Sequence, residues 1–600
     1  MEACFKELFV RKYNKYQVYV HNLVKFDIIF LLKYLIKYVS VKPLIHKGRI
    51  IQLTINYGPD LQYSLNFKDS YLILLASLAK LSKSFVIDTP KSIFPHKFVN
   101  ENNLNYIGPV PDFKYFYNIS KEEYLNYCKS FNNNWSLKDE AIKYCEIDCI
   151  SLYQIILKFN SLIFDLFSKN IHRYPTVPSL AFSIFRSIFM ELENIPKLTG
   201  NIARDIRSGY TGGSTDMFIP RTPKGVKIKC LDVNSLYPSV MLDQPMPIGK
   251  ADRFYGDIRK IDGNAFGFFY VKVNCPKNIL HPILQIKHKT DNGIKTISPV
   301  GTWSMWIFSP EMDNAKKYGY SFEIMKGYKF EKGIIFKDYI DFLYSLRSQY
   351  SREHPLNLIA KILLNSLYGR FGMNDDFPDI TIFDNKKSYL NFMKDESQDI
   401  FGDIELGNKV LVKHRSENKN RQTMLYGNLE THNTNVAIAS AITAYARIHM
   451  TQFKNNPNFN LYYTDTDSAY IDRPLPDYMI SKTILGKMKL ENILDDAIFL
   501  APKVYYLINE LDQHIYKVKG FSHDVIWNKN DFENLLNKQS FLKKLQTKWR
   551  KNLSEGNISV LDEVYTLQVT SNKRKLIYEN GILVGTEPYV INVNKEILNK

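Results

Sequence analysis

The stretch NLYYTDTDSAYI, residues 460–471, places two aspartates two positions apart in a run of tyrosines and other strand-forming residues. Residues two apart in a strand face the same side, so we expect Tyr463, Asp465 and Asp467 to project together, with Asp-Thr-Asp at or near a hairpin tip. Neighbouring carboxylates repel each other, and a divalent cation that prefers oxygen ligands removes the repulsion. The stretch therefore predicts a metal-binding site, although Asp-x-Asp also occurs in ordinary turns and in nucleotide-sugar glycosyltransferases.

A second carboxylate lies in KIKCLDVNSLYPSVM, residues 227–241, where Asp232 ends an apolar strand just before a turn closed by Pro238. A carboxylate at the end of a strand, beside exposed backbone amides, is well placed to hold a metal ion against a phosphate. The alternative is structural, because an aspartate in this position could cap a helix that begins in SLYPSVM.

A third segment, LIAKILLNSLYGRFG at residues 358–372, has apolar residues at helical spacing and ends in glycines. On a helix Lys361, Asn365 and Tyr368 form one face, while the leucines between them turn toward a core. A lysine, an amide and an aromatic ring on one stripe can hold a triphosphate and stack on a base. The alternative is a solvated helix face without function.

The composition favours a polyanionic partner. The 600 residues carry a formal net charge of +18, and the basic residues are spread along the chain. This favours nucleic acid over a membrane, although a lysine-rich coding bias would give the same charge. The most apolar early stretch, residues 26–39, is too short to span a bilayer and contains two lysines, so we expect no spanning helix and no membrane partner.

The order of patterns predicts an α+β chain with several domains. The first 170 residues alternate strand-like and helix-like segments, with a boundary near residue 175. A β-rich region then extends to about residue 335, followed by helices, a polar and irregular stretch at 373–425, and a strong helix ahead of the opening strand. The last hundred residues are expected to mix helices with a hairpin at Asn580-Gly581, which suits a type I′ turn.

Taken together, an aspartate before SLYP, a Lys-x3-Asn-Ser-x-Tyr-Gly helix and a Tyr-x-Asp-Thr-Asp-Ser hairpin, in that order, resemble the signature of family B DNA polymerases. The motifs YTGG, residues 210–213, and KVYYL, residues 503–507, are similar to those of the protein-primed branch found in phages and linear plasmids. The resemblance covers essentially the whole chain. It implies an RNase H-like α/β exonuclease domain followed by a right-hand polymerase with palm, fingers and thumb.

The resemblance also implies the domain boundaries. Residues 1–172 would be an exonuclease-like domain without its first motif, 173–248 the linker, template-binding loop and first part of the palm, 249–335 a palm insertion like the terminal-protein region, 336–372 the fingers, 373–425 a second insertion, 426–490 the palm with the Asp-Thr-Asp hairpin, and 491–600 the thumb.

By the same resemblance, Asp232 and Asp467 would bind two Mg²⁺ ions, with Asp465 as a supporting catalytic carboxylate and Tyr463 shaping the pocket. The metals would activate the primer 3′-hydroxyl and stabilise the leaving pyrophosphate. This answers what two aspartates could do in a tyrosine-rich strand.

The substrate contacts implied by the resemblance come from other motifs. Tyr237 would exclude a ribose 2′-hydroxyl, Lys361 and Asn365 would hold the incoming triphosphate, and Tyr368 would pack on the nascent base pair. The DNA contacts would come from Tyr210, Gly212 and Gly213 on the template and from Lys503 and Tyr505 on the primer. Glycines allow backbone amides to approach phosphates closely.

The N-terminal region resembles a 3′–5′ proofreading exonuclease in which carboxylates hold two metals. HNLVKFD supplies Asn22 and Asp27, and YCEID supplies Tyr144 and Asp148 one helical turn apart. The family's first motif, Asp-x-Glu, is missing, because no aspartate precedes Asp27. Either the chain begins downstream of its true start or the domain has lost two metal ligands, so we expect little or no exonuclease activity.

The partners implied are a DNA template and primer, deoxynucleoside triphosphates and a terminal protein that primes replication of a linear plasmid. Mitochondrion is the expected location, with a phage-infected cell or fungal cytoplasm as the alternative. A reverse transcriptase fits poorly because the two aspartates are not adjacent. The competing hypothesis from another class is a non-catalytic DNA-binding relic of a plasmid polymerase gene.

Overall fold

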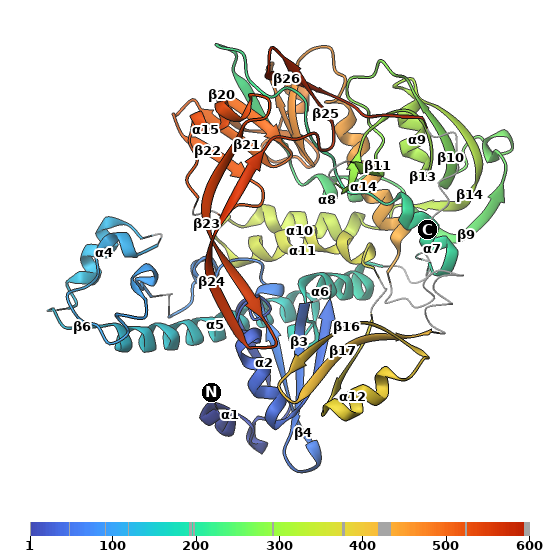
Figure 1. Ribbon diagram of the computed structural model, residues 1–600. Coiled ribbons are helices and arrows are strands. Elements are labelled where there is room, and N and C mark those ends of the chain that lie inside the picture. Colours follow the sequence, from blue (N-terminus) through green and yellow to red (C-terminus); the bar gives the residue numbers. More distant parts are fainter. Residues whose placement is uncertain are drawn as a thin grey trace. The chain divides into compact units, whose positions relative to one another are not determined.

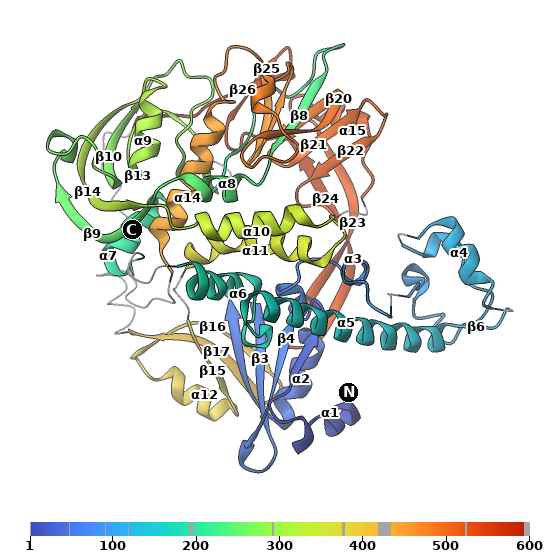
Figure 2. The same ribbon diagram turned by 180° about the vertical axis from the view of Figure 1, so that it is seen from behind.

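The computed structural model describes residues 2–46, 49–89, 92–117, 119–131, 133–190, 195, 198–290, 293–374, 378–417, 434–522 and 525–592. Helices and mostly antiparallel strands alternate throughout, which confirms the α+β prediction (Figures 1 and 2). The chain divides into two compact units. The first contains Met1–Ile188 and Phe342–Leu364, and the second contains Phe189–Asp341 and Asn365–Lys600.

The first unit is built on a four-stranded sheet in the order β1-β4-β3-β2. The strands are β1 (Gln17–Val20), β2 (Ser40–His46), β3 (Arg49–Tyr57) and β4 (Tyr63–Asp69). β1 runs parallel to β4, and the remaining pairs are antiparallel. The strand-like segments expected in this region are confirmed, and residues of β3 and β4 are buried with the alternation that a strand period requires.

Helices cover this sheet and extend the first unit. They are α1 (Glu2–Leu8), α2 (Asp27–Tyr38), α3 (Leu78–Phe85), α4 (Lys121–Cys128), α5 (Leu137–Phe167) and α6 (Val177–Ile184), with a short pair β5 (Ile107–Gly108) and β6 (Trp135–Ser136). α3 begins at Leu78, and the apolar residues that precede it are not part of the helix. The Ser77 side chain accepts the Lys80 N–H and so starts the helix at this point.

Among the helices in the described ranges, α5 is the one whose length and composition would allow it to cross a membrane. No membrane-spanning helix is expected from the sequence. The apolar residues of α5 have a use inside the unit. Ile155, Phe159 and Ile163 are fully buried, on the same helix face. This is the pattern of a helix that packs one stripe against a protein core.

The second unit is built on a seven-stranded antiparallel sheet in the order β22-β21-β20-β8-β19-β18-β7. The strands are β7 (Thr215–Met217), β8 (Ile228–Val233), β18 (Leu461–Asp465), β19 (Ser468–Ile471), β20 (Met488–Ala501), β21 (Val504–Asn509) and β22 (His514–Val518). Aromatic rings from different strands pack together, with Tyr463 of β18 stacked on Phe499 of β20 at 5.1 Å between centroids. The opening stretch supplies two of the inner strands of this sheet, β18 and β19.

A five-stranded sheet in the order β27-β13-β10-β14-β9 makes a second layer of the same unit. Its strands are β9 (Met246–Tyr255), β10 (Gly267–Cys275), β13 (Val300–Phe308), β14 (Ser321–Gly333) and β27 (Val590–Asn592), and the hairpin β11 (Ile286–Thr290) and β12 (Gly293–Ile297) adjoins it in sequence. This confirms the predicted β-rich region.

α14 (Val436–Thr451) is the central helix of the second unit and is buried along almost its whole length. It packs against α7 (Gly200–Gly209), α8 (Leu236–Asp243), α9 (Ser309–Lys316) and β9. Its alanines permit close approach on several sides, and the Asn435 side chain caps its first turn. The predicted helix ahead of the opening strand is thus confirmed.

α10 (Lys337–Gln349) and α11 (Pro355–Phe371) confirm the predicted helical stretch. The polar stretch that follows was expected to be irregular, and that expectation is wrong. It forms a three-stranded sheet of β15 (Asp379–Phe383), β17 (Lys409–Ser416) and β16 (Gln398–Leu406), with α12 (Lys386–Met393) beside it. The few apolar residues of this stretch are enough to form a core for the sheet, because Val410, Leu411 and Val412 of β17 are all buried. Residues 375–377 and 418–425 lie outside the described ranges.

The last hundred residues are mainly strands, which corrects the expected mixture with helices. They form the long ribbon β23 (Phe541–Asn552) and β24 (Asn557–Gln568), the hairpin β25 (Lys575–Glu579) and β26 (Ile582–Glu587), and only α15 (Lys529–Leu535) among the described residues (Figure 1). Asn580 and Gly581 have φ of 47° and 80°, which confirms the type I′ turn.

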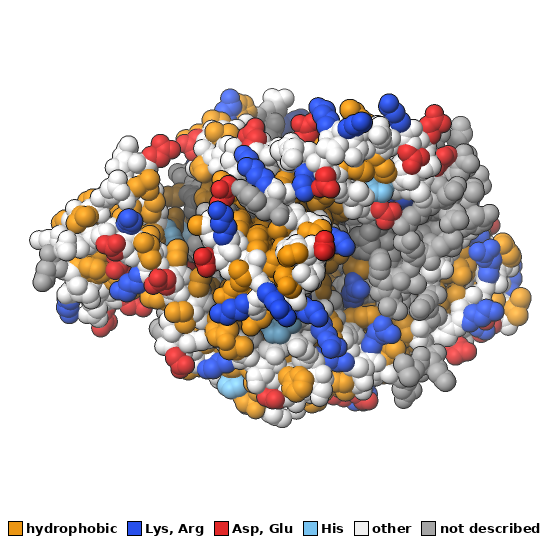
Figure 3. Space-filling view, turned by 90° about the horizontal axis from the view of Figure 1, so that it is seen from below, with side chains coloured by type: hydrophobic (Ala, Val, Ile, Leu, Met, Phe, Trp, Pro, Cys, Tyr) orange, Lys and Arg blue, Asp and Glu red, His pale blue; other side chains and the backbone are white. Residues whose placement is uncertain are grey.

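Figure 3 shows where lysines and arginines lie on one face of the molecule. On the face seen in Figure 3 they are interspersed with apolar and acidic side chains instead of forming one basic patch. The net charge alone therefore does not locate a binding site.

Candidate active site

The opening stretch forms a tight hairpin between β18 and β19. Asp465 pairs with Ser468 across the two strands, and Thr466 and Asp467 make the turn, with Thr466 at φ 64°. The hairpin-tip prediction is confirmed. Asp467 lies in the turn, however, so strand alternation does not orient it as expected, and its N–H instead donates to the Asp465 carbonyl at 2.7 Å.

Asp232 lies next to this turn. It is the last residue but one of β8 and pairs with Ser468 of β19, and the Val233 N–H donates to the Asp467 carbonyl at 2.9 Å. The two predicted metal-binding aspartates, distant in sequence, are therefore on adjacent backbone segments. α8 begins after Ser235, so Asp232 is not its capping residue and the structural alternative for this aspartate is wrong.

Asp232 and Asp467 are both partly buried. Burial, followed by the charges of Asp467 and Glu491, raises the pKa of Asp232 to about 7. Burial and the nearby Asp465 raise the pKa of Asp467 as well. A pair of carboxylates with raised pKa values carries negative charge that a cation would stabilise. In the described part of the chain, no group of three or more His, Cys, Asp or Glu side chains is arranged to hold a metal.

Asp465 has different partners from the other two aspartates. Lys503 Nζ contacts its carboxylate oxygens at 2.6 and 2.9 Å, and the Thr215 hydroxyl donates to it at 2.9 Å. The Lys503 N–H donates to the hydroxyl of buried Tyr463 at 2.9 Å, which fixes the strand start that carries this lysine. Tyr505 packs edge-on against Tyr463 at 5.7 Å. The KVYYL motif is thus joined to the hairpin.

Tyr237 of α8 and Tyr368 of α11 form a stacked pair with ring centroids 4.4 Å apart and planes at 17°. Burial raises the pKa of both phenols, and Asp467 and Tyr210 contribute to both shifts. The two tyrosines are therefore close to each other, to the Thr466–Asp467 turn and to the YTGG loop, although their motifs are separated in sequence.

α11 presents the face that the sequence predicts. Lys361 and Asn365 are exposed and Tyr368 is half-buried, while the intervening leucines are buried. The helix crosses the division between the units, so Lys361 is described with the first and Asn365 and Tyr368 with the second. Partial burial, followed by Arg347, Lys80 and Arg352, lowers the pKa of Lys361. Its role in binding triphosphate stays a prediction.

The YTGG loop is fixed by a buried ion pair that the sequence did not reveal. Arg447 of α14 contacts Glu311 of α9 at 2.7 and 2.8 Å and donates to the Thr211 and Gly212 carbonyls at 2.6 and 3.2 Å. Neither residue stands in a motif with an obvious chemical role. Glu491 was missed for the same reason, since only the pairing of β20 with β8 brings it to Asp232.

Gly213 gives a prediction that separates packing from simple flexibility. A Cβ at Gly213 would lie 2.7 Å from Thr466 Cγ2 and 3.1 Å from Thr466 Cα, whereas a Cβ at Gly212 would meet nothing within 4 Å. We expect Gly213→Ala to displace the turn that carries Asp467 and to lower the rate of the polymerisation that the family resemblance implies roughly 10-fold or more, because small misplacements of reacting groups are costly. Gly212→Ala is the matched control, and equal primer-extension rates for the two variants would contradict this account.

A separate cluster lies in the first unit, around the predicted exonuclease residues. Asp69 accepts backbone N–H groups from Asn22, Val24 and Tyr71 at 2.8–3.0 Å, and Asn22 itself has φ 71°. Burial raises the pKa of Asp27, and Asp69 adds to the shift. Asp69 was missed because its part in shaping the HN turn requires β1 and β4 to be neighbours.

Tyr144 and Asp148 lie one turn apart on α5, as predicted. Burial and then Asp148 raise the pKa of Tyr144, whose ring contacts Phe94 and His96 at 5.1 and 5.3 Å. The carboxylate that shifts Asp27 is Asp69, and the carboxylate that shifts Tyr144 is Asp148.

Comparison with known proteins gives a consistent result. Residues 8–459 match the family "DNA polymerase type B, organellar and viral". The chain is 38% identical to a probable DNA polymerase of Neurospora intermedia, over 93% of this chain and 58% of that protein. It is 36% identical to one of Ascobolus immersus, over 100% of this chain and 50% of that protein. The chain spans about half the length of the curated relatives it matches.

Among solved structures, the fold is similar to that of Phi29 DNA polymerase complexed with primer-template DNA and incoming nucleotides. The TM-score is 0.66 at 19% identity, over 95% of this chain and 93% of the other. The mixed multidomain fold is therefore shared over nearly the full length. The extent of the family match shows that this chain belongs to the type B DNA polymerases of organelles and viruses.

Proposed function

We propose that this chain is a DNA-directed DNA polymerase that adds deoxynucleotides to a primer 3′-hydroxyl. The observation that carries the proposal is the pair Asp232 and Asp467, on adjacent strand ends with raised pKa values. Support comes from the relatives, which are named probable DNA polymerases, and from the solved relative, which binds primer-template DNA and nucleotides. The seven-stranded sheet would then be the palm.

Asp232 and Asp467 fit the two Mg²⁺ ions that this reaction uses, because their uncompensated charge is what hard divalent cations bind. When bound, the ions activate the attacking hydroxyl and stabilise the leaving pyrophosphate. Asp465 would have a supporting role. It holds Lys503 at the edge of the pocket, where this lysine and Tyr505 could receive the primer strand.

The proposal assigns nucleotide binding to the face of α11 and the stacked tyrosines. Lys361 and Asn365 would hold the triphosphate, and Tyr368 would pack on the nascent base pair. The template would be contacted by Tyr210, Gly212 and Gly213. Arg447 holds this loop by donating hydrogen bonds to two of its carbonyls.

Sugar selection gives a direct test of Tyr237. We expect Tyr237→Ala to raise ribonucleotide incorporation relative to deoxynucleotide incorporation by roughly 10- to 100-fold, because the space filled by the ring would admit a 2′-hydroxyl. Tyr237→Phe keeps the ring and is the matched control. The ratio of kcat/KM for the two sugars measures the effect, and an unchanged ratio in Tyr237→Ala would remove Tyr237 from this role.

We also propose that the 600-residue chain removes mismatched primer ends poorly. Asp27 and Asp148 are its candidate metal ligands for excision, and Asp69 has its oxygens occupied by backbone N–H groups. In the exonucleases that this region resembles, four carboxylates hold the two ions, and the residues assigned here by motif supply two of them. A 3′-mismatched, labelled primer incubated with Mg²⁺ and no nucleotides should stay intact. Efficient excision that is lost in Asp27→Asn would contradict the proposal.

The biological setting follows from family likeness alone. It would be protein-primed replication of a linear plasmid, with a terminal protein as primer and the mitochondrion as location. Primer extension by the purified chain, with template, Mg²⁺ and the four deoxynucleotides, tests the central activity. Binding of DNA without any extension would favour the alternative of a non-catalytic DNA-binding relic.

A further inference from the structure

Lys454 lies just after α14 and beneath the catalytic hairpin, with only 5% of its surface exposed. Its Nζ donates to the Ser214 hydroxyl at 2.9 Å. The carbonyl of Ser214 in turn accepts the Thr466 N–H at 2.8 Å. A single residue, Ser214, therefore connects the buried lysine to the turn that carries Asp467.

β7 follows Ser214, and residues on both of its faces interact with neighbouring side chains. On one side Thr215 donates its hydroxyl to Asp465 at 2.9 Å. Asp216, the next residue, is 5% exposed and carries the negative charge that acts on both Lys454 and Arg574. Because successive residues of a strand face opposite sides, β7 separates the catalytic carboxylates from a buried layer of charges.

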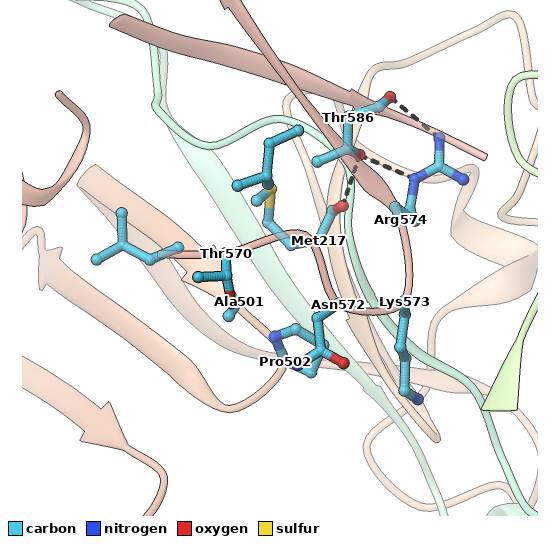
Figure 4. Close-up of a pocket in the computed structure, with 10 residues that line it drawn as sticks. Met217, Ala501, Pro502, Thr570, Asn572, Lys573, Arg574 and Thr586 are labelled. Atoms are coloured by element: carbon cyan, nitrogen blue, oxygen red, sulfur yellow. Dashed lines mark hydrogen bonds between the residues drawn. The ribbon is translucent and has the colours of Figure 1, made fainter. Parts of the chain in front are cut away.

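The end of β7 is fixed as well. Arg574 donates to the Thr586 hydroxyl at 2.8 Å, and that hydroxyl donates to the Met217 carbonyl at 2.8 Å. Figure 4 shows these contacts in a small pocket lined in part by Met217, Arg574 and Thr586. β7 is thus anchored at Met217 by Arg574 and at Ser214 by Lys454.

Burying the ammonium group of a lysine at this position is energetically unfavourable. Burial lowers the pKa of Lys454, and a buried charge is tolerated only when it is paired and hydrogen-bonded. Asp216 supplies the charge and Ser214 the hydrogen bond. An apolar side chain would fill the same space but would leave Ser214 and the attached turn without this contact.

We infer that Lys454 is a positioning residue that holds the Thr466–Asp467 turn, through Ser214, in register with Asp232. The inference rests on the proposed polymerase function. Because Lys454 is hidden behind β7, its loss should lower kcat without changing how tightly the protein binds nucleotide or DNA.

The experiment compares Lys454→Met, Ser214→Ala, the double variant and Ser214→Thr, with Lys387→Met as the matched change of an exposed lysine. Single-turnover extension, corrected for the active fraction, gives kcat, and titrations give nucleotide KM and primer-template Kd. We expect Lys454→Met and Ser214→Ala each to lower kcat roughly 10- to 100-fold, the cost of a misplaced reacting group. The nucleotide KM and the primer-template Kd should stay within about twofold of the values of the unmodified chain, because sites without shared contacts affect each other only slightly. The double variant should be no slower than Lys454→Met, and Ser214→Thr, which keeps the hydroxyl, should retain most activity.

Three results would overturn the inference. Additive losses in the double variant would show that Lys454 does not act through Ser214, and a Lys454→Met protein with lower stability but normal kcat per active site would show a purely structural role. If Lys454→Met does not fold, Ser214→Ala decides, and a normal kcat in that variant sinks the inference. Inactivity of both the unmodified chain and Lys387→Met would instead overturn the proposed function, and this inference with it.

Discussion

Asp467→Asn is expected to abolish primer extension, with a single-turnover rate lowered roughly 10³-fold or more, as for other residues on which the chemical step depends. Asparagine keeps the size of the side chain and removes the negative charge, so the turn should persist while the cation affinity is lost. Binding of primer-template DNA should be retained, because a carboxylate repels phosphate and Asp467 therefore contributes no attractive contact to the DNA backbone.

Asp477→Asn is the control for this experiment, since Asp477 is exposed in the segment after β19. It should extend primers at the normal rate. The metal-free Asp467→Asn protein should also be at least as stable as the unmodified chain at pH 8, because the substitution removes a buried charge that repels its neighbours. A variant that unfolds, or one that still extends primers at a tenth of the normal rate, would contradict the assignment of Asp467.

The Mg²⁺ requirement should depend strongly on pH. The proton on Asp232, with its pKa of about 7 in the metal-free pocket, competes with the cation. The half-saturating Mg²⁺ concentration should therefore rise about tenfold for each pH unit below 7 and should level off above it. Extension rates titrated with Mg²⁺ from pH 5.5 to 8.5 measure this dependence. A midpoint that stays constant from pH 5.5 to 7 would contradict it.

The same group gives a metal-free stability test with a defined sign. The pKa of Asp232 rises on folding from 3.8 to about 7, so the folded state binds more protons than the unfolded state between these values. The free energy of unfolding should therefore fall as the pH rises through this window and lose no more to this residue above it. Asp232→Asn should flatten that part of the profile.

The parts of the fold that the sequence predicts well are those with a local cause. The strand pattern around Asp465 and the helix face of Lys361 and Asn365 repeat with periods of 2 and 3.6, and the Asn580-Gly581 turn needs positive φ at both residues. The three motifs of the site were found for a related reason, since each places an uncommon residue combination on one short element.

The residues that the sequence did not reveal depend on pairings between distant segments. Arg447 and Glu311 meet because α14 packs on α9, and Lys503 reaches Asp465 only through its place at the start of β21. Asp467 could not be oriented by strand alternation because the turn residue Thr466 has a left-handed conformation. The C-terminal strands β23 and β24 pair with each other along their whole length, and the sequence did not reveal that pairing.

Template-directed incorporation tests the central claim most directly. A primer annealed to four templates that differ only in the next base is incubated with the purified chain, Mg²⁺ and one labelled deoxynucleotide at a time. We expect each template to direct addition of its complementary nucleotide by the unmodified chain, and we expect the Asp232→Asn variant to add none. Absence of incorporation by the unmodified chain, or incorporation that ignores the template base, would contradict the central claim.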